Sequence, residues 1–133
     1  MLPFKEMLLV GTGGFLGANA RYVLGTLFAI YAERVLDDAS IPYGTLIVNV
    51  TGSFALAFFA AYIATQGRWS PDLRLLISVG FFGAYTTFST FSNESLAFLR
   101  LGQWSNALIY MAVTHILCLL AAFLGLWLSS RFW

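Results

Sequence analysis

The chain has 133 residues, of which 59% are hydrophobic and 10% are charged, and its formal net charge is +1. A soluble domain of this size carries roughly 25% charged residues, so the composition predicts an integral membrane protein with one domain. The near-neutral charge excludes a basic surface for nucleic acid, and the single cysteine, Cys118, excludes a disulfide framework. We expect no removable signal peptide, because no small-residue cleavage site follows a short apolar segment.

Four apolar segments are long enough to cross a bilayer, for which a helix needs about 20 residues. They cover residues 7–32, 43–65, 73–99 and 104–130. The sequence therefore predicts a single all-α transmembrane domain of four helices, surrounded by lipid, with both chain ends on one side of the membrane. No nucleophile paired with a base and no cluster of metal ligands is visible, so an enzyme is not expected.

The positive charges at and beyond the ends of these segments are nearly balanced between the two sides of the membrane. The side with the chain ends carries Lys5, Arg68, Arg74 and Arg131, and the other side carries Arg34 and Arg100. Orientation in the membrane follows the excess of Lys and Arg. The small difference found here permits one fixed orientation, and it equally permits insertion in both.

The first segment carries a stripe of small residues that includes one cation. Gly13, Gly17 and Gly25 share a four-residue spacing, which lets helix backbones approach closely. Arg21 lies on the same face. A buried Arg costs about 2.5–3.5 kcal/mol unless it is paired or hydrated, so we expect Arg21 to face protein or water. It then has either a structural or vestibule role or acts as a direct ion ligand.

The second segment carries Thr45, Asn49 and Ser53 at four-residue intervals, and so on one helix face. A side-chain amide in the middle of a membrane needs a partner. For Asn49 the partner is either another helix, in a hydrogen bond worth about 0.6–2 kcal/mol, or a permeating anion that accepts a hydrogen bond from the amide.

The third segment contains the stretch GFFGAYTTFSTFSNES, residues 80–95. Glycine weakens a helix, and clustered Ser and Thr side chains redirect backbone hydrogen bonds, so we expect an interruption between Gly83 and Thr87. Backbone that is not helical at this depth must lie against protein or water, where its carbonyl groups can bind a cation. The alternative is a Phe-rich helix packed in a bundle, whose hydroxyl groups bond to the preceding turn.

The fourth segment repeats the four-residue spacing with Tyr110, Thr114 and Cys118. His115 lies next to this face. A lone histidine without a second ligand at a suitable spacing is a poor metal candidate, so we expect a neutral, packed side chain. Polar residues on three of four short helices favour an interface shared between subunits, since four helices alone rarely enclose an aqueous path.

Together these motifs resemble the Fluc (CrcB) family of fluoride channels. The resemblance covers essentially the whole chain, with GGFLGANAR in the first segment, GTLIVNVTGSF in the second, GFFGAYTTFSTFSNE in the third and Tyr110 in the fourth. It implies a passive channel that exports fluoride from the cytoplasm across a bacterial inner membrane and so gives fluoride resistance. It also implies an antiparallel, dual-topology homodimer with two pores, each using residues from both subunits.

The resemblance further implies roles for individual residues. A structural sodium ion would lie at the dimer centre, held by the backbone carbonyl groups of Gly83 and Thr86 from each subunit. Phe88 and Phe91 would turn their electropositive ring edges toward fluoride, and Asn49 would donate to it. The remaining pore positions would be Ser89, Thr90, Ser92, Tyr110, Thr114 and Glu94. Cys118 stands where some relatives have a hydroxyl group.

Two other kinds of membrane protein also fit four short helices. A proton-coupled small multidrug-type exporter needs an ionisable carboxylate within the membrane, and here Glu94 lies toward the end of the third segment. Dependence on a pH gradient would identify such an exporter. A structural subunit of a larger complex would use the polar residues only to join helices, and conduction by the purified protein alone would exclude it.

Overall fold

A computed structural model of the chain describes residues 3–35, 40–66 and 70–132, and this part is helical throughout its regular structure. The elements in chain order are α1 (Phe4–Val35), α2 (Tyr43–Gln66), α3 (Pro71–Arg74), the π-helix η1 (Leu75–Phe82), α4 (Gly83–Tyr85), α5 (Phe88–Arg100), α6 (Trp104–Ser129) and the 3₁₀ turn η2 (Ser130–Phe132). The four predicted helical segments are thus present, the third one as α3, η1, α4 and α5. Arg68, counted above among the positive charges, lies outside the described residues.

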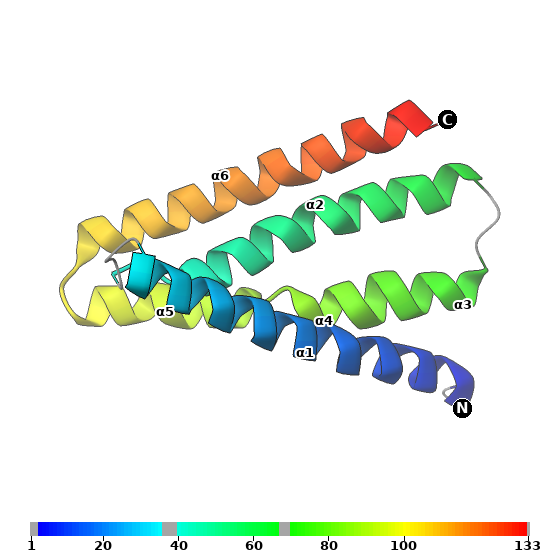
Figure 1. Cartoon of the computed structure of the whole chain (residues 1–133), viewed down its shortest axis with the longest axis horizontal. Helices are drawn as coiled ribbons and strands as arrows, with labels where there is room; N and C mark the ends of the chain where they lie inside the picture. The colour runs from blue at the N-terminus through cyan, green and yellow to red at the C-terminus, as the bar shows by residue number, and fades with distance from the viewer. Residues whose placement is uncertain (1–2, 36–39, 67–69, 133) are drawn as a thin grey trace.

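The four segments lie side by side along the long axis of the molecule (Figure 1). The most extensive packing joins α2 to α6 and α1 to η1. α1 begins and α6 ends at the same end of the bundle (Figure 1), as an even number of crossings would require.

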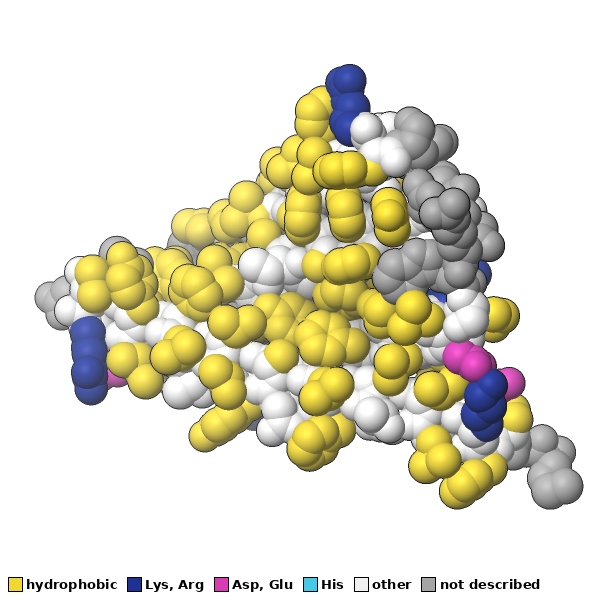
Figure 2. All heavy atoms as spheres, turned by 45° about the vertical axis from the view of Figure 1, so that its right-hand side comes forward, with side chains coloured by type: hydrophobic (Ala, Val, Ile, Leu, Met, Phe, Trp, Pro, Cys, Tyr) yellow, Lys and Arg dark blue, Asp and Glu magenta, His cyan; other side chains and the backbone are white. Residues whose placement is uncertain are grey.

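Three segments are long and apolar enough to cross a membrane: Tyr43–Ala64, Pro71–Arg100 and Trp104–Phe132. With 32 residues, α1 is longer than needed, but it carries Thr12, Asn19 and Arg21 among its apolar residues. Hydropathy therefore does not single it out within the described chain, and its crossing stays a prediction. Figure 2 shows hydrophobic side chains spread over one face of the molecule and charged ones at its edges, as lipid contact requires.

Glycines bring α1 into backbone contact with the π-helix. A Cβ atom at Gly13 would lie 2.1 Å from the carbonyl oxygen of Leu76, and one at Gly17 would lie 2.1 Å from that of Phe81. The predicted small-residue stripe is thus the packing face of α1. The π-helix itself was not expected from the sequence; such widened turns are frequent near functional sites.

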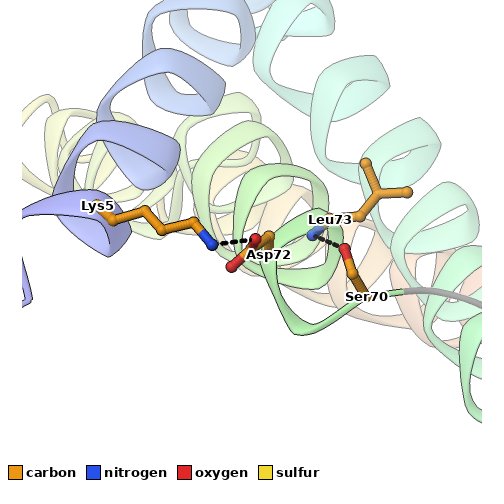
Figure 3. A network of polar contacts seen from close by, with 4 residues as sticks. All are labelled: Lys5, Ser70, Asp72 and Leu73. Atoms are coloured by element: carbon orange, nitrogen blue, oxygen red, sulfur yellow. Dashed lines mark hydrogen bonds and ion pairs between the residues drawn. The ribbon is translucent and has the colours of Figure 1, made fainter.

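The start of the third segment is stabilised by a helix cap and by one ion pair (Figure 3). The Ser70 side chain accepts a hydrogen bond from the backbone N–H of Leu73, and Pro71 occupies the first turn, a typical helix N-terminus. The Lys5 ammonium group pairs with the Asp72 carboxylate, which ties the start of α1 to α3. The pair is exposed, so its stabilising effect is at most about 1 kcal/mol.

The other end of this segment closes in a glycine turn. Gly102 has a φ of +72°, its N–H donates to the Leu99 carbonyl, and the N–H of Gln103 donates to that of Phe98. This Schellman-type arrangement satisfies the last carbonyl groups of α5 and turns the chain into α6.

We expect Gly17→Ala to destabilise the bundle by about 1–3 kcal/mol, because the added methyl group would overlap the Phe81 backbone. Gly11→Ala is the matched control on the same helix, since a Cβ atom there meets nothing within 4 Å. Thermal unfolding in detergent, followed by circular dichroism, measures both. Equal melting temperatures would contradict the close α1 packing described here.

Candidate functional site

The third segment is interrupted where the sequence predicted it. α4 ends at Tyr85 and α5 begins at Phe88, and the two residues between them are extended. Thr86 has a ψ of 156°, and Thr87 has φ −149° and ψ 107°. The expected break is therefore confirmed and is confined to two residues. α2 reaches it closely because residue 52 is glycine: a Cβ atom there would lie 2.3 Å from the Thr86 methyl group.

The side chain of Asn49 forms hydrogen bonds with the backbone of the interruption. Its Oδ1 accepts a hydrogen bond of 2.8 Å from the backbone N–H of Thr87, and its Nδ2 donates one of 3.1 Å to the Thr87 carbonyl. Asn49 is buried, with 8% of its surface exposed. The interhelical role considered for Asn49 is thus observed. One of the two hydrogens on Nδ2 remains for another acceptor, so the second role, donation to an anion, stays compatible with it.

Two carbonyl groups at the break lose the partners that a continuous helix would supply. In a continuous helix the Thr87 N–H would donate to the Gly83 carbonyl oxygen, but here it donates to Oδ1 of Asn49. The Thr90 N–H would reach the Thr86 carbonyl, but it donates to the hydroxyl of Thr87. A Cβ atom at Gly83 would meet nothing within 4 Å. The oxygens of Gly83 and Thr86 are therefore suitable for a hard cation, which prefers oxygen ligands.

A cavity of about 320 Å³ lies beside the interruption, between α2, α5 and α6. We call it the break cavity. Four residues predicted for the pore line it: Asn49, Phe88, Phe91 and Thr114. The two phenyl rings lie 5.8 Å apart at 45°. Phe88 is 73% exposed and Phe91 only 5%, so one ring lies at the surface of this single chain and the other is anchored in it.

The hydroxyl groups near the interruption differ in their hydrogen-bond partners and in their exposure. Those of Ser92 and Ser95 donate to the carbonyl groups of Phe88 and Phe91, one turn earlier, as the packed-helix alternative predicted. The Thr114 hydroxyl is buried, at 4% exposure, and has no hydrogen-bond partner among the described residues. Ser89 and Thr90 are exposed. Among the residues that line the break cavity, Thr114 therefore has a hydroxyl hydrogen that is available to a bound ion.

A carboxylate joins three helices at one end of the site. Glu94 on α5 accepts 2.7 Å hydrogen bonds from the hydroxyl of Thr45 on α2 and from that of Tyr110 on α6. The Tyr110 ring also lies 5.3 Å from that of Phe91. Both carboxylate oxygens thus have a neutral donor, which satisfies the group without a cation.

A second cavity, of about 630 Å³, lies between α1, α2 and α5. We call it the Arg21 cavity, because Arg21 lines it together with Thr45, Thr87 and Glu94. Arg21 is half-buried and forms no ion pair within the described part of the chain. It lies beside open volume, the environment expected of a cation in this segment. Thr87 lines both cavities.

Sequence reasoning missed several residues that form the site. Tyr85 is buried, and its hydroxyl lies 2.8 Å from that of Thr51, which gives α2 a further contact at the break. Two residues named in the sequence without a place in the pore, Ser53 and His115, also line the break cavity. The expectation that His115 is packed is wrong, because its side chain is exposed in the single chain. The four-residue spacing of Thr45, Asn49 and Ser53 was the available signal for α2. The spacing could not identify partners on other helices.

The bundle is all-helical, three of its segments are apolar enough to cross a membrane, and two partly polar cavities flank the broken third segment. These features indicate a membrane protein. The sequence matches the family model described as CrcB-like protein, Camphor Resistance (CrcB), over residues 8–126. The chain therefore belongs to the CrcB-like family.

Named relatives agree with this assignment. The chain is 41% identical over 124 residues to a protein from Koribacter versatilis named fluoride-specific ion channel FluC, an alignment that covers 93% of this chain and 94% of the relative. It is 44% identical over 120 residues to a protein of the same name from Shewanella sp. strain W3-18-1, covering 90% and 92%. Both relatives are named as ion channels and neither as an enzyme, which supports the expectation that the chain is not an enzyme.

We expect Asn49→Asp to destabilise the protein by about 1–3 kcal/mol, because it removes the donor to the Thr87 carbonyl and sets two oxygens against each other. Asn106→Asp introduces the same charge at an exposed position near the start of α6 and should stay within about 0.5 kcal/mol. Unfolding temperatures in detergent compare the two. If the two variants have the same unfolding temperature, the hydrogen bonds of Asn49 do not stabilise the interruption.

Proposed function

We propose that this protein is a passive, fluoride-selective channel that exports fluoride from the cytoplasm and so gives fluoride resistance. The observation that carries the proposal is the break cavity, where the spare amide donor of Asn49, the unpaired hydroxyl of Thr114 and two phenyl rings converge. The names of the relatives support the same ion. A bacterial inner membrane is the site we propose for it.

The chemistry of the cavity suits a small, strongly hydrated anion. To enter, fluoride must exchange its water for compact donors, and an amide N–H and a hydroxyl group are such donors. The positive edge of a phenyl ring adds a weak attraction. None of these groups carries a full positive charge, so the ion is bound weakly enough to leave again.

We further propose that two copies assemble with opposite orientations and form two pores at their interface. Phe88 is 73% exposed in the single chain although it lines the break cavity, so a second copy would complete the wall. The near-balance of Lys and Arg between the two sides permits both orientations. In this assembly Ser89, Thr90 and Ser92, which are exposed in the single chain, would face the partner or the pore.

A sodium ion at the dimer centre is part of the proposal. The Gly83 and Thr86 carbonyl oxygens, deprived of their helical partners, fit such an ion. Their position at the interruption would let both subunits contribute. When bound, the ion would balance the carbonyl dipoles and join the two chains.

Passive efflux from liposomes that contain the purified protein tests the function. At fixed pH we expect rapid release of fluoride and retention of chloride, with empty liposomes as the control. Flux that requires a pH gradient would favour the proton-coupled exporter, in which Glu94 would carry the proton. Absence of flux for either ion would favour a structural subunit.

We expect Phe88→Ile to reduce fluoride efflux by about tenfold or more, equivalent to about 1.4 kcal/mol in the barrier, because the ring edge is lost. The stability of the single chain should be unchanged, since the ring is exposed in it. Phe123→Ile is the control: this ring is 69% exposed on α6 and lies outside the break cavity. Equal efflux from both variants would remove Phe88 from the mechanism. Phe91→Ile is less decisive, because Phe91 also belongs to the core.

Replacing sodium by a bulky organic cation throughout purification should weaken the dimer, if the carbonyl groups at the break hold the ion. Size-exclusion chromatography over a range of protein concentrations measures the dissociation. A dimer of equal affinity in both cations would mean that no sodium ion joins the subunits.

A further inference from the structure

We propose that His115 and Cys118 form a binding site for soft metal cations such as Cd²⁺, and that an occupied site blocks the break cavity. Both side chains line that cavity and both come from α6. Residues three apart on a helix are neighbours on one face, with Cβ atoms about 5–6 Å apart. Thiolate sulfur and imidazole nitrogen are the ligands that such ions favour. The block rests on the proposed function, whereas the binding does not.

One ring nitrogen of His115 has a backbone partner, and the other has no hydrogen-bond partner among the described residues that would compete with a metal. Its Nδ1 lies 2.8 Å from the backbone carbonyl oxygen of Met111. A carbonyl oxygen only accepts, so Nδ1 carries the hydrogen, and Nε2 of the neutral ring keeps its lone pair. Metal-binding histidines usually donate their second nitrogen to a carbonyl or carboxylate in this way.

The unpaired hydroxyl of Thr114 independently indicates that this cavity accepts a polar guest. Thr114 lies four residues before Cys118, and therefore on the same face of α6. Its oxygen is buried without a partner among the described residues, which is costly unless a guest supplies one. A metal-bound water molecule would do so, and the hydroxyl would hold it beside the two ligands.

The chain offers no competing thiol, since Cys118 is its only cysteine and is not in a disulfide. Within the described residues no group of three or more His, Cys, Asp or Glu side chains is placed to hold a metal. Binding requires no redox partner: the thiol proton passes to water, a sulfur–metal bond forms, and water completes the coordination. An ion bound there would occupy the volume next to Asn49 and Phe88.

Titration of the purified protein with cadmium nitrate tests the binding directly. The thiolate-to-cadmium charge-transfer band in the ultraviolet should saturate at one ion per chain. Cys118→Ser should abolish the band, and His115→Asn should weaken the affinity by about tenfold or more. Both variants keep every carboxylate, so they also control for binding elsewhere. No band, a band that survives in Cys118→Ser, or an affinity unaffected by His115→Asn would overturn the site.

Fluoride efflux from liposomes, with and without Cd²⁺, tests the block. Each variant is compared with its own metal-free rate. Cd²⁺ should slow wild-type efflux over the same concentration range as the titration, a chelator should restore it, and Cys118→Ser should resist. Wild-type efflux that continues with the metal bound would overturn the block. Absence of efflux before metal is added would instead refute the proposed function, while the spectroscopic titration would still decide the binding.

Discussion

The pair of hydrogen bonds between the Asn49 side chain and the Thr87 backbone is the constraint on which the rest of the site depends. A bilayer offers no water to an open backbone, so a membrane helix can be interrupted only where protein or a wet cavity satisfies its polar groups. Asn49 meets both polar groups of Thr87 with one side chain. Because an amide has a donor and an acceptor side by side, no apolar or purely accepting residue could replace it.

The interruption sets the environment of the groups around it. The Thr87 hydroxyl caps α5 by accepting from the Thr90 N–H, so the new helix begins at Phe88. That start places Phe91 against Tyr110 on α6 and leaves Phe88 at the surface. The carbonyl groups of Gly83 and Thr86 are left without the N–H donors that a continuous helix would give them. Free acceptors and a spare amide donor thus lie together at one local departure from helical geometry.

The two cavities meet at Thr87, and their chemistry differs. The break cavity is lined by uncharged donors and aromatic rings, whereas the Arg21 cavity has Arg21, Glu33 and Glu94 in its wall. Glu94 is satisfied by two hydroxyl groups, from Thr45 and Tyr110, and these bonds fix α5 between α2 and α6. In the proposed channel, the larger cavity with charged residues would collect the ion and the smaller one would select it by size.

The sequence alone determined the helical segments, the place of the interruption and the polar residues that border it. A membrane helix satisfies its own backbone, so apolar length identifies it, and local composition weakens it at Gly83 to Thr87. Only the tertiary structure decided the hydrogen-bond partners. Asn49 bonds to Thr87, which is 38 positions further along the chain, and Thr45 bonds to Glu94, which is 49 positions further. Those contacts depend on the depth and rotation of each helix. Both are set by close packing, including the unpredicted π-helix against Gly13, and short-range sequence patterns carry no information on them.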